Sequence, residues 1–212
     1  MAVTPGHTGD AVVAGGTRSF PTRAVPRVEL PASTSYLAGA AAAQLGWEGV
    51  VLPEVTILGR RVCVVAKLRT DVHAERIAVG IGPVTDRTTV ATWTWPEFAR
   101  TAPAPAAEIV GVLSVARHWR TGMASVVPFS RYGEAAMLLP TSAVLSKDYV
   151  DSCLPRARSY GIAVVSADEH ANVERDIPGR PERTLLPQDS VSRWINEMVY
   201  EQLLASYDLP VA

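Results

Sequence analysis

The chain has only two cysteines, no long apolar run and no clear excess of charge of either sign. Cys63 and Cys153 are spaced too widely for a zinc motif and are too few for a disulfide framework. The longest run of small apolar residues, 38–43, is too short to span a membrane, and residues 1–20 lack the pattern of a signal peptide. We therefore expect a cytoplasmic protein without a membrane segment.

The charge is close to balanced, because 20 Lys and Arg residues face 21 Asp and Glu residues, for a net charge of -1. A protein dedicated to nucleic-acid binding usually carries a clear basic excess. The composition therefore argues against tight, nonspecific DNA binding by the isolated chain.

The apolar content is sufficient for one sizeable core, since 48% of the 212 residues are hydrophobic. Residues 1–31 contain many glycines and prolines but few large apolar side chains, which predicts a flexible, disordered arm. Residues 32–212 are predicted to form a single α/β domain with a mixed central sheet flanked by helices.

Hydrophobic periodicity and turn residues predict the elements of this domain. Strands are predicted over residues 50–57, 61–68, 76–81, 125–129, 135–139 and 162–165. One helix is predicted from a cap at Ser33, Thr34 or Ser35 to about Leu45, with Gly46 as its stop. Further helices are predicted from about 106 to 119, between a Ser146 cap and Gly161, and over 190–206. The polar segment 169–187 is predicted to be an exposed loop. Residues 135–165 have the length of a strand, a crossover helix and a parallel strand.

This order of elements resembles that of the PD-(D/E)XK, or restriction-endonuclease-like, nucleases. Residues 59–66 and 77–82 resemble the two central strands of that family, and 135–165 resembles its C-terminal half. The resemblance covers roughly residues 33–167. It implies an acidic residue on the first central strand and an acid-x-Lys triplet on the second, because carboxylates hold a divalent metal while the lysine positions the attacking water.

The positions that would carry this chemistry hold other residues. In the first register, Cys63 takes the acidic position and Gly80-Ile81-Gly82 takes the triplet, with glycines that indicate a close approach of another segment or a deleted function. A shifted register makes Glu54 the acid and places Lys67 in the triplet, and Glu48 is a further candidate ligand. Even this register lacks the second carboxylate.

Two other arrangements compete with the metal site. Cys63 with His73 or His118 has the residue types of a thiolate and its base, but the valines around Cys63 are typical of a buried cysteine. Asp71, His73 and Glu75 alternate in a predicted turn and could ligate a metal from one side, although charges in such turns are ordinarily hydrated.

Two groups of side chains suggest binding. Aromatic and guanidinium groups occur close together in the sequence at Arg117, Trp119, Arg120 and Arg131. Such groups can stack on nucleic-acid bases or form a protein hot spot. The helix predicted over residues 190–206 has an apolar stripe that contains Trp194, Ile195 and Met198. This stripe either docks on the body of the domain or forms a partner or homo-oligomer interface.

We therefore expect a catalytically inactive, nuclease-like interaction subunit without a cofactor, associated with nucleic acid within a larger assembly. One alternative is an active, magnesium-dependent DNA-processing nuclease with migrated acids drawn from Glu48, Glu54 and Asp71. The other is a structural or oligomerising protein that uses the C-terminal helix.

Overall fold

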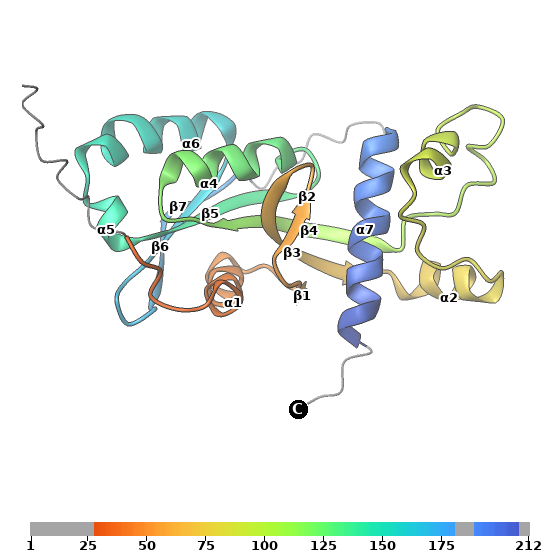
Figure 1. Ribbon diagram of the computed structural model, residues 1–212, viewed down its shortest axis with the longest axis horizontal. Helices are drawn as coiled ribbons and strands as arrows, with labels where there is room; N and C mark the ends of the chain where they lie inside the picture. The colour runs from red at the N-terminus through yellow and green to blue at the C-terminus, as the bar shows by residue number, and fades with distance from the viewer. Residues whose placement is uncertain (1–27, 181–188, 208–212) are drawn as a thin grey trace, which may run out of the picture.

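A computed structural model describes residues 28–180 and 189–207 (Figure 1). Within these residues, seven strands form one mixed sheet in the order β1-β3-β4-β5-β6-β7, and β2 pairs with β3 outside that path. The strands are β1 (Val50–Val51), β2 (Val55–Ile57), β3 (Arg60–Leu68), β4 (Ala107–Val115), β5 (Glu134–Pro140), β6 (Ala163–Ala167) and β7 (Val173–Ile177). The predicted mixed sheet flanked by helices is confirmed. Most of the predicted arm, residues 1–27, lies outside the described residues.

The helices connect and cover these strands. They are α1 (Thr34–Leu45), α2 (Thr70–Ala78), α3 (Arg87–Thr92), α4 (Trp119–Val126), α5 (Thr141–Val144), α6 (Leu154–Tyr160) and α7 (Ser190–Tyr207), with short turns of other helix types at Val127–Phe129 and Tyr149–Cys153. Helix α1 begins after Ser33, one of the three predicted caps, whose side chain accepts from the Tyr36 N–H. It ends as predicted at Gly46, which takes a left-handed conformation. The predicted last helix is also confirmed.

The strand directions explain the architecture. Strand β3 is antiparallel to β1, β2 and β4, so the first two predicted strand segments pair with each other in antiparallel fashion. Strands β4, β5 and β6 are parallel and are connected by helices, whereas β7 returns antiparallel at the far edge. The unit from β5 through α6 to β6 confirms the predicted strand, crossover helix and parallel strand.

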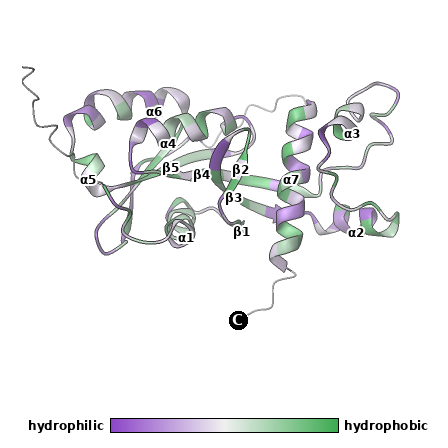
Figure 2. Ribbon diagram, viewed as in Figure 1, coloured by the Kyte–Doolittle hydropathy of each residue, from purple (hydrophilic) through white to green (hydrophobic). Residues whose placement is uncertain are grey.

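Helix α1 covers one face of the sheet, and α4, α6 and α7 cover the other (Figure 1). Successive residues of a strand point to opposite faces, so Cys63 packs in the α1 core and Val64 in the α7 core. Likewise, Leu138 faces α1 and Met137 faces α4 and α6. Figure 2 shows β4 and β5 as hydrophobic along most of their length, as expected for strands covered on both faces.

The segment 76–81, predicted as a strand, is instead the end of α2 and the loop that follows it. The alternating Ile77 and Val79 are 57% and 67% exposed, while the helix buries Val72 and Arg76. The expected close approach at the two glycines is also wrong, because a Cβ atom at Gly80 or Gly82 would meet nothing within 4 Å.

Three further predictions are corrected by the structure. Residues 107–115, predicted within a helix, form β4, and residues 125–129, predicted as a strand, end α4 and continue into a short turn. The described part of the predicted loop 169–187 contains β7. A strand buried on both faces loses the alternation that identifies strands, and a polar edge strand shows no apolar pattern.

Residues 69–106 contain α2 and α3 and pack against α7 (Figure 1). Arg76 of α2 and Glu197 of α7 form a two-point ion pair with N–O distances of 2.7 and 2.8 Å, and each side chain is 3% exposed. Arg76 also donates to the carbonyl oxygen of Gly82 and lies over the Tyr200 ring, while Glu197 accepts from a backbone N–H of the same loop. Both buried charges are therefore compensated within the chain, as burial of an ion pair requires.

The apolar stripe of α7 is part of the core. Trp194 is 9% exposed and Ile195 1% exposed, and Met198 packs against the same core. The docking alternative is correct for this stripe. Trp194 donates to the Thr85 carbonyl oxygen and lies under the Arg87 guanidinium, so the expected partner interface through the stripe is corrected: its residues pack within the chain.

Candidate functional site

The candidate residues of the metal-dependent alternative do not lie together. Glu54 forms an ion pair with Arg61 near the start of β3, and Glu48 pairs with Lys67 near its end at 3.0 Å. Lys67 follows Arg61 by six positions along β3, which corresponds to about 20 Å. Asp71 is farther along the chain, on α2, with a side chain that is 72% exposed.

The other predicted arrangements are not assembled either. Cys63 is 1% exposed in the α1 core, and burial, more than the neighbouring charge of Glu54, raises the pKa of its thiol to about 12. A thiol with this pKa is not a nucleophile near neutral pH. Asp71 and His73 lie on α2, where His73 Nδ1 is 2.7 Å from the Tyr200 hydroxyl. Over residues 28–180 and 189–207, no group of three or more His, Cys, Asp and Glu side chains is placed to hold a metal ion.

The four predicted binding residues divide into three situations. Trp119 Nε1 and the Arg120 guanidinium both donate to Asp148, at 2.8 and 3.0 Å, and these contacts, the Trp119 bond first, lower the pKa of that carboxyl. Trp119 is only 5% exposed, so it does not present a ring face for stacking. Arg131 lies before the amino end of β5 and pairs with the carboxylate that caps α7. Arg117 remains as the candidate with no such partner in residues 28–180 and 189–207.

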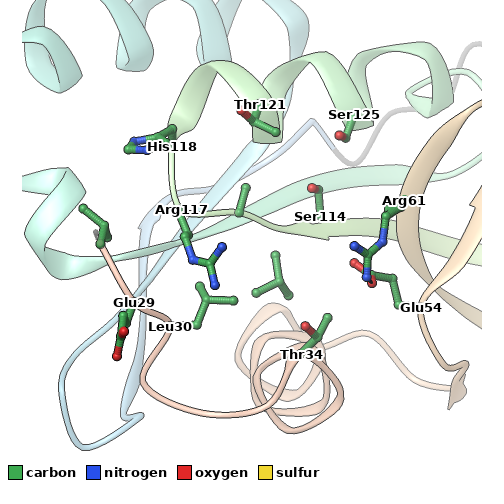
Figure 3. Close-up of a pocket in the computed structure, with 13 residues that line it drawn as sticks. Glu29, Leu30, Thr34, Glu54, Arg61, Ser114, Arg117, His118, Thr121 and Ser125 are labelled. Carbon is green, nitrogen blue, oxygen red and sulfur yellow. Dashed lines mark hydrogen bonds and ion pairs between the residues drawn. The ribbon is translucent and has the colours of Figure 1, made fainter. Parts of the chain in front are cut away.

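A hollow of about 860 Å³ lies beside the last residues of β4 (Figure 3). The pairing of β3 with β4 ends at Cys63–Leu113, whereas the pairing of β4 with β5 continues to Val115–Leu138. The end of β4 therefore has a paired strand on one side and the hollow on the other. Helix α4 forms one wall, and α1 with residues 28–30 forms the opposite wall. Ligands of α/β proteins commonly bind at this carboxyl end of parallel strands.

The α1 side of the hollow contains Arg117. This arginine lies two residues after the end of β4 and is exposed, and Figure 3 shows its guanidinium pointing into the space between β4 and α1. Among the described residues, its guanidinium has no hydrogen-bond or ion-pair partner. Its N–H donors, arranged in a planar fork, are therefore available to a ligand.

Hydroxyl groups line the α4 side. Ser114 of β4 is 4% exposed and Ser125 of α4 is 9% exposed, and Thr121 lies on the same face of α4 four residues before Ser125. Neither serine hydroxyl has a hydrogen-bond partner in the described part of the chain. Every completely buried side-chain oxygen in this part of the chain has a hydrogen-bond partner. The two serine oxygens have none, so they are not completely buried, and both serines line the hollow. Nearly buried hydroxyls without partners are uncommon because their desolvation costs free energy.

The remaining charged groups define the ends of the hollow. Arg61 and Glu54 form their ion pair at one end, with side chains that are 76% and 21% exposed. Glu29 lies near the other end and points away from Arg117 in Figure 3. His118, the N-cap residue of α4, makes no side-chain capping bond. The two arginines and two glutamates balance formally, but only Glu54 neutralises an arginine directly.

Comparison of the chain with protein-family models, with curated proteins and with solved structures finds no match in any of the three. The resemblance to restriction-endonuclease-like nucleases therefore stays a prediction based on the order of elements. Within the described ranges, no helix combines the length and the apolar character needed to cross a membrane.

Sequence reasoning identified Arg117 but missed Ser114, Thr121 and Ser125. The missing signal was the end of a buried strand at Val115. Polar residues on either side of such an end are candidates for a site at the carboxyl edge of the sheet. Because residues 106–119 were predicted as one helix, that strand end was not visible in the pattern.

Proposed function

We propose that this chain is a catalytically silent protein with a restriction-endonuclease-like arrangement, which acts as an interaction subunit and binds nucleic acid through the hollow beside β4. The observation that carries the proposal is the composition of this hollow. It combines hydroxyl groups with an arginine that has no partner among the described residues, a combination that suits a phosphate-bearing ligand. The candidate metal ligands Glu48 and Glu54 instead pair with residues at opposite ends of β3, and Asp71 lies on α2.

The order of elements supports the fold part of the proposal. Helix α1 precedes the antiparallel hairpin of β2 and β3, and β4 is followed by a helical crossover to the parallel strand β5. In this arrangement the second central strand is β4, rather than the segment 77–82. The acidic residue of β4 is Glu108, which lies opposite Lys67 and far from Cys63 and its partner Leu113. The two central strands therefore lack the neighbouring carboxylates that a divalent metal needs.

The proposal is tested by incubating the protein with labelled single-stranded and duplex DNA in the presence of magnesium or manganese, and by measuring binding of the same DNA by fluorescence anisotropy. We expect binding that weakens as salt is raised, without cleavage. The matched variants Arg117→Gln and Arg131→Gln each remove one exposed guanidinium, and we expect only the first to weaken binding.

Two results would contradict this function. Metal-dependent cleavage that is lost in Glu54→Ala or Lys67→Ala would establish the active-nuclease alternative. Equal binding by the Arg117→Gln variant and the unaltered chain would remove the hollow from the interaction.

A further inference from the structure

The hollow beside β4 combines nearly buried hydroxyl groups with exposed guanidinium groups. Ser114 and Ser125 are 4% and 9% exposed, whereas Arg117 and Arg61 are exposed. A phosphate at the end of a nucleotide chain carries up to two negative charges, against one for a phosphodiester within the chain. A guanidinium without a partner among the described residues therefore favours the end of a chain over its middle.

The two sides of the hollow offer different chemistry. Arg117 on the α1 side is a cation with a planar fork of donors, the side chain best suited to two-point recognition of a phosphate. Ser114, Thr121 and Ser125 on the α4 side are neutral and can both donate and accept hydrogen bonds. Such a pair of surfaces fits a ligand that has an anionic group at one end and a neutral polar body beside it.

From these observations we infer that the hollow is a binding site for a nucleotide with a terminal phosphate, with the phosphate at Arg117 and the polar groups of the nucleoside at Ser114 and Ser125. This inference rests on the proposed function, and it names the part of the nucleic acid that is recognised. The nucleotide is either free or the end of a strand, since both carry the same phosphomonoester. A volume of about 860 Å³ lies within the range of small-ligand sites.

Glu54 regulates the strength of this site. Its carboxylate is bound to Arg61 at one end of the hollow, so it neutralises a second cation and adds a negative charge near an anionic ligand. Replacing Glu54 by Gln removes this charge and releases Arg61. The expected result is tighter phosphate binding, and loss of folding cannot produce this direction of change.

The test uses the full chain and a short single-stranded DNA labelled at its 3′ end, with either a 5′-phosphate or a 5′-hydroxyl group. We expect the phosphorylated strand to bind about tenfold or more tightly, because a hydrogen-bonded charge pair contributes at least this factor. The difference should disappear in Arg117→Gln, decrease in Ser114→Ala, increase in Glu54→Gln and remain in Arg131→Gln. Circular dichroism of each variant checks that the fold is kept.

Competition experiments distinguish the two sources of the ligand. A deoxynucleoside 5′-monophosphate that displaces the phosphorylated strand at equal concentration identifies a free-nucleotide site, and weaker displacement identifies a strand-end site. Either result supports the inference. Inorganic phosphate that competes as well as the nucleotide would overturn it, since the nucleoside would then make no contact.

The inference and the proposed function fail in different ways. Equal affinity for the two strand ends, or a preference that survives Arg117→Gln, overturns the inference but leaves a silent scaffold that binds nucleic acid. Metal-dependent cleavage of the probe overturns the proposed function but leaves the preference for the phosphorylated end.

Discussion

The contact between α2 and α7 and the hollow beside β4 both contain arginine within a mainly apolar structure, but they differ in how the polar groups are satisfied. In the first, Arg76 is 3% exposed and is held by Glu197, by backbone oxygens and by the Tyr200 ring. In the second, Arg117 is exposed without a partner among the described residues, and the nearly buried Ser114 and Ser125 also lack partners there.

This difference separates a structural role from a binding role. A buried group whose hydrogen bonds are complete contributes to folding and has no capacity left for a ligand. A site that keeps unsatisfied donors gives up some stability, and native proteins tolerate such deviations mainly at functional positions. The comparison therefore predicts opposite mutational behaviour at the two arginines.

The largest effect is expected from Glu197→Ala. This change leaves the Arg76 guanidinium buried without its carboxylate, and breaking a buried pair in this way costs about 3–5 kcal/mol. Urea unfolding followed by circular dichroism measures the loss. The double variant Arg76→Met with Glu197→Leu removes both charges and should recover a large part of the stability. A loss below about 1 kcal/mol for Glu197→Ala would show that the pair is not buried in solution.

The next effect concerns the stripe of α7. Trp194 packs in the core and its Nε1 donates to the carbonyl oxygen of Thr85 at 2.8 Å, so Trp194→Ala should lower the free energy of unfolding by about 3 kcal/mol. Light scattering should give the same molar mass for the variant and the unaltered chain. A dimer that dissociates in Trp194→Ala, with unchanged unfolding, would instead support the oligomerisation alternative.

A much smaller effect on stability is expected from Arg117→Gln. Its guanidinium has no hydrogen-bond or ion-pair partner in the described ranges, so the change in unfolding free energy should stay within about 0.5 kcal/mol while DNA binding is weakened. Parallel measurement of unfolding and anisotropy separates the two quantities. A loss of stability comparable with that of Glu197→Ala would show that Arg117, like Arg76, has a structural role, and would contradict the difference between the two regions.

The smallest effect is expected from thiol reagents. Burial raises the pKa of Cys63 to about 12 and that of Cys153 to about 11, so at pH 8 only a minute fraction of either thiol is ionised. Ellman's reagent should therefore release almost no colour from the folded chain, and two equivalents after unfolding in guanidinium. Rapid reaction of one thiol in the folded chain would contradict this expectation and would support the hypothesis that Cys63 is a nucleophile.

Sequence reasoning succeeded where a local signal and tertiary packing agree. Helix α1 has a serine cap and a glycine stop that predict its ends, and α7 has an apolar stripe that packs in the core. It failed for β4, whose residues are apolar on both faces, and for α2, which buries the charged Arg76 and exposes the apolar Ile77. No local pattern reveals that an arginine will be paired with a glutamate far along the chain.

The candidate site was less predictable than the fold. Arg117 could be named from its type and its neighbourhood of aromatic residues, but an arginine becomes a candidate ligand group only when it is known to lack a partner. The same is true of Ser114, whose importance depends on the point where β3 stops pairing with β4. Such facts are properties of the packed chain, so sequence patterns alone could not supply them.

The most direct test of the binding role is a crystal structure of the chain with a short 5′-phosphorylated single-stranded DNA. We predict that the terminal phosphate contacts the Arg117 guanidinium and that the attached nucleoside lies against Ser114 and Ser125. A complex in which the strand is ordered elsewhere on the protein, while the hollow beside β4 contains only solvent, would contradict the account.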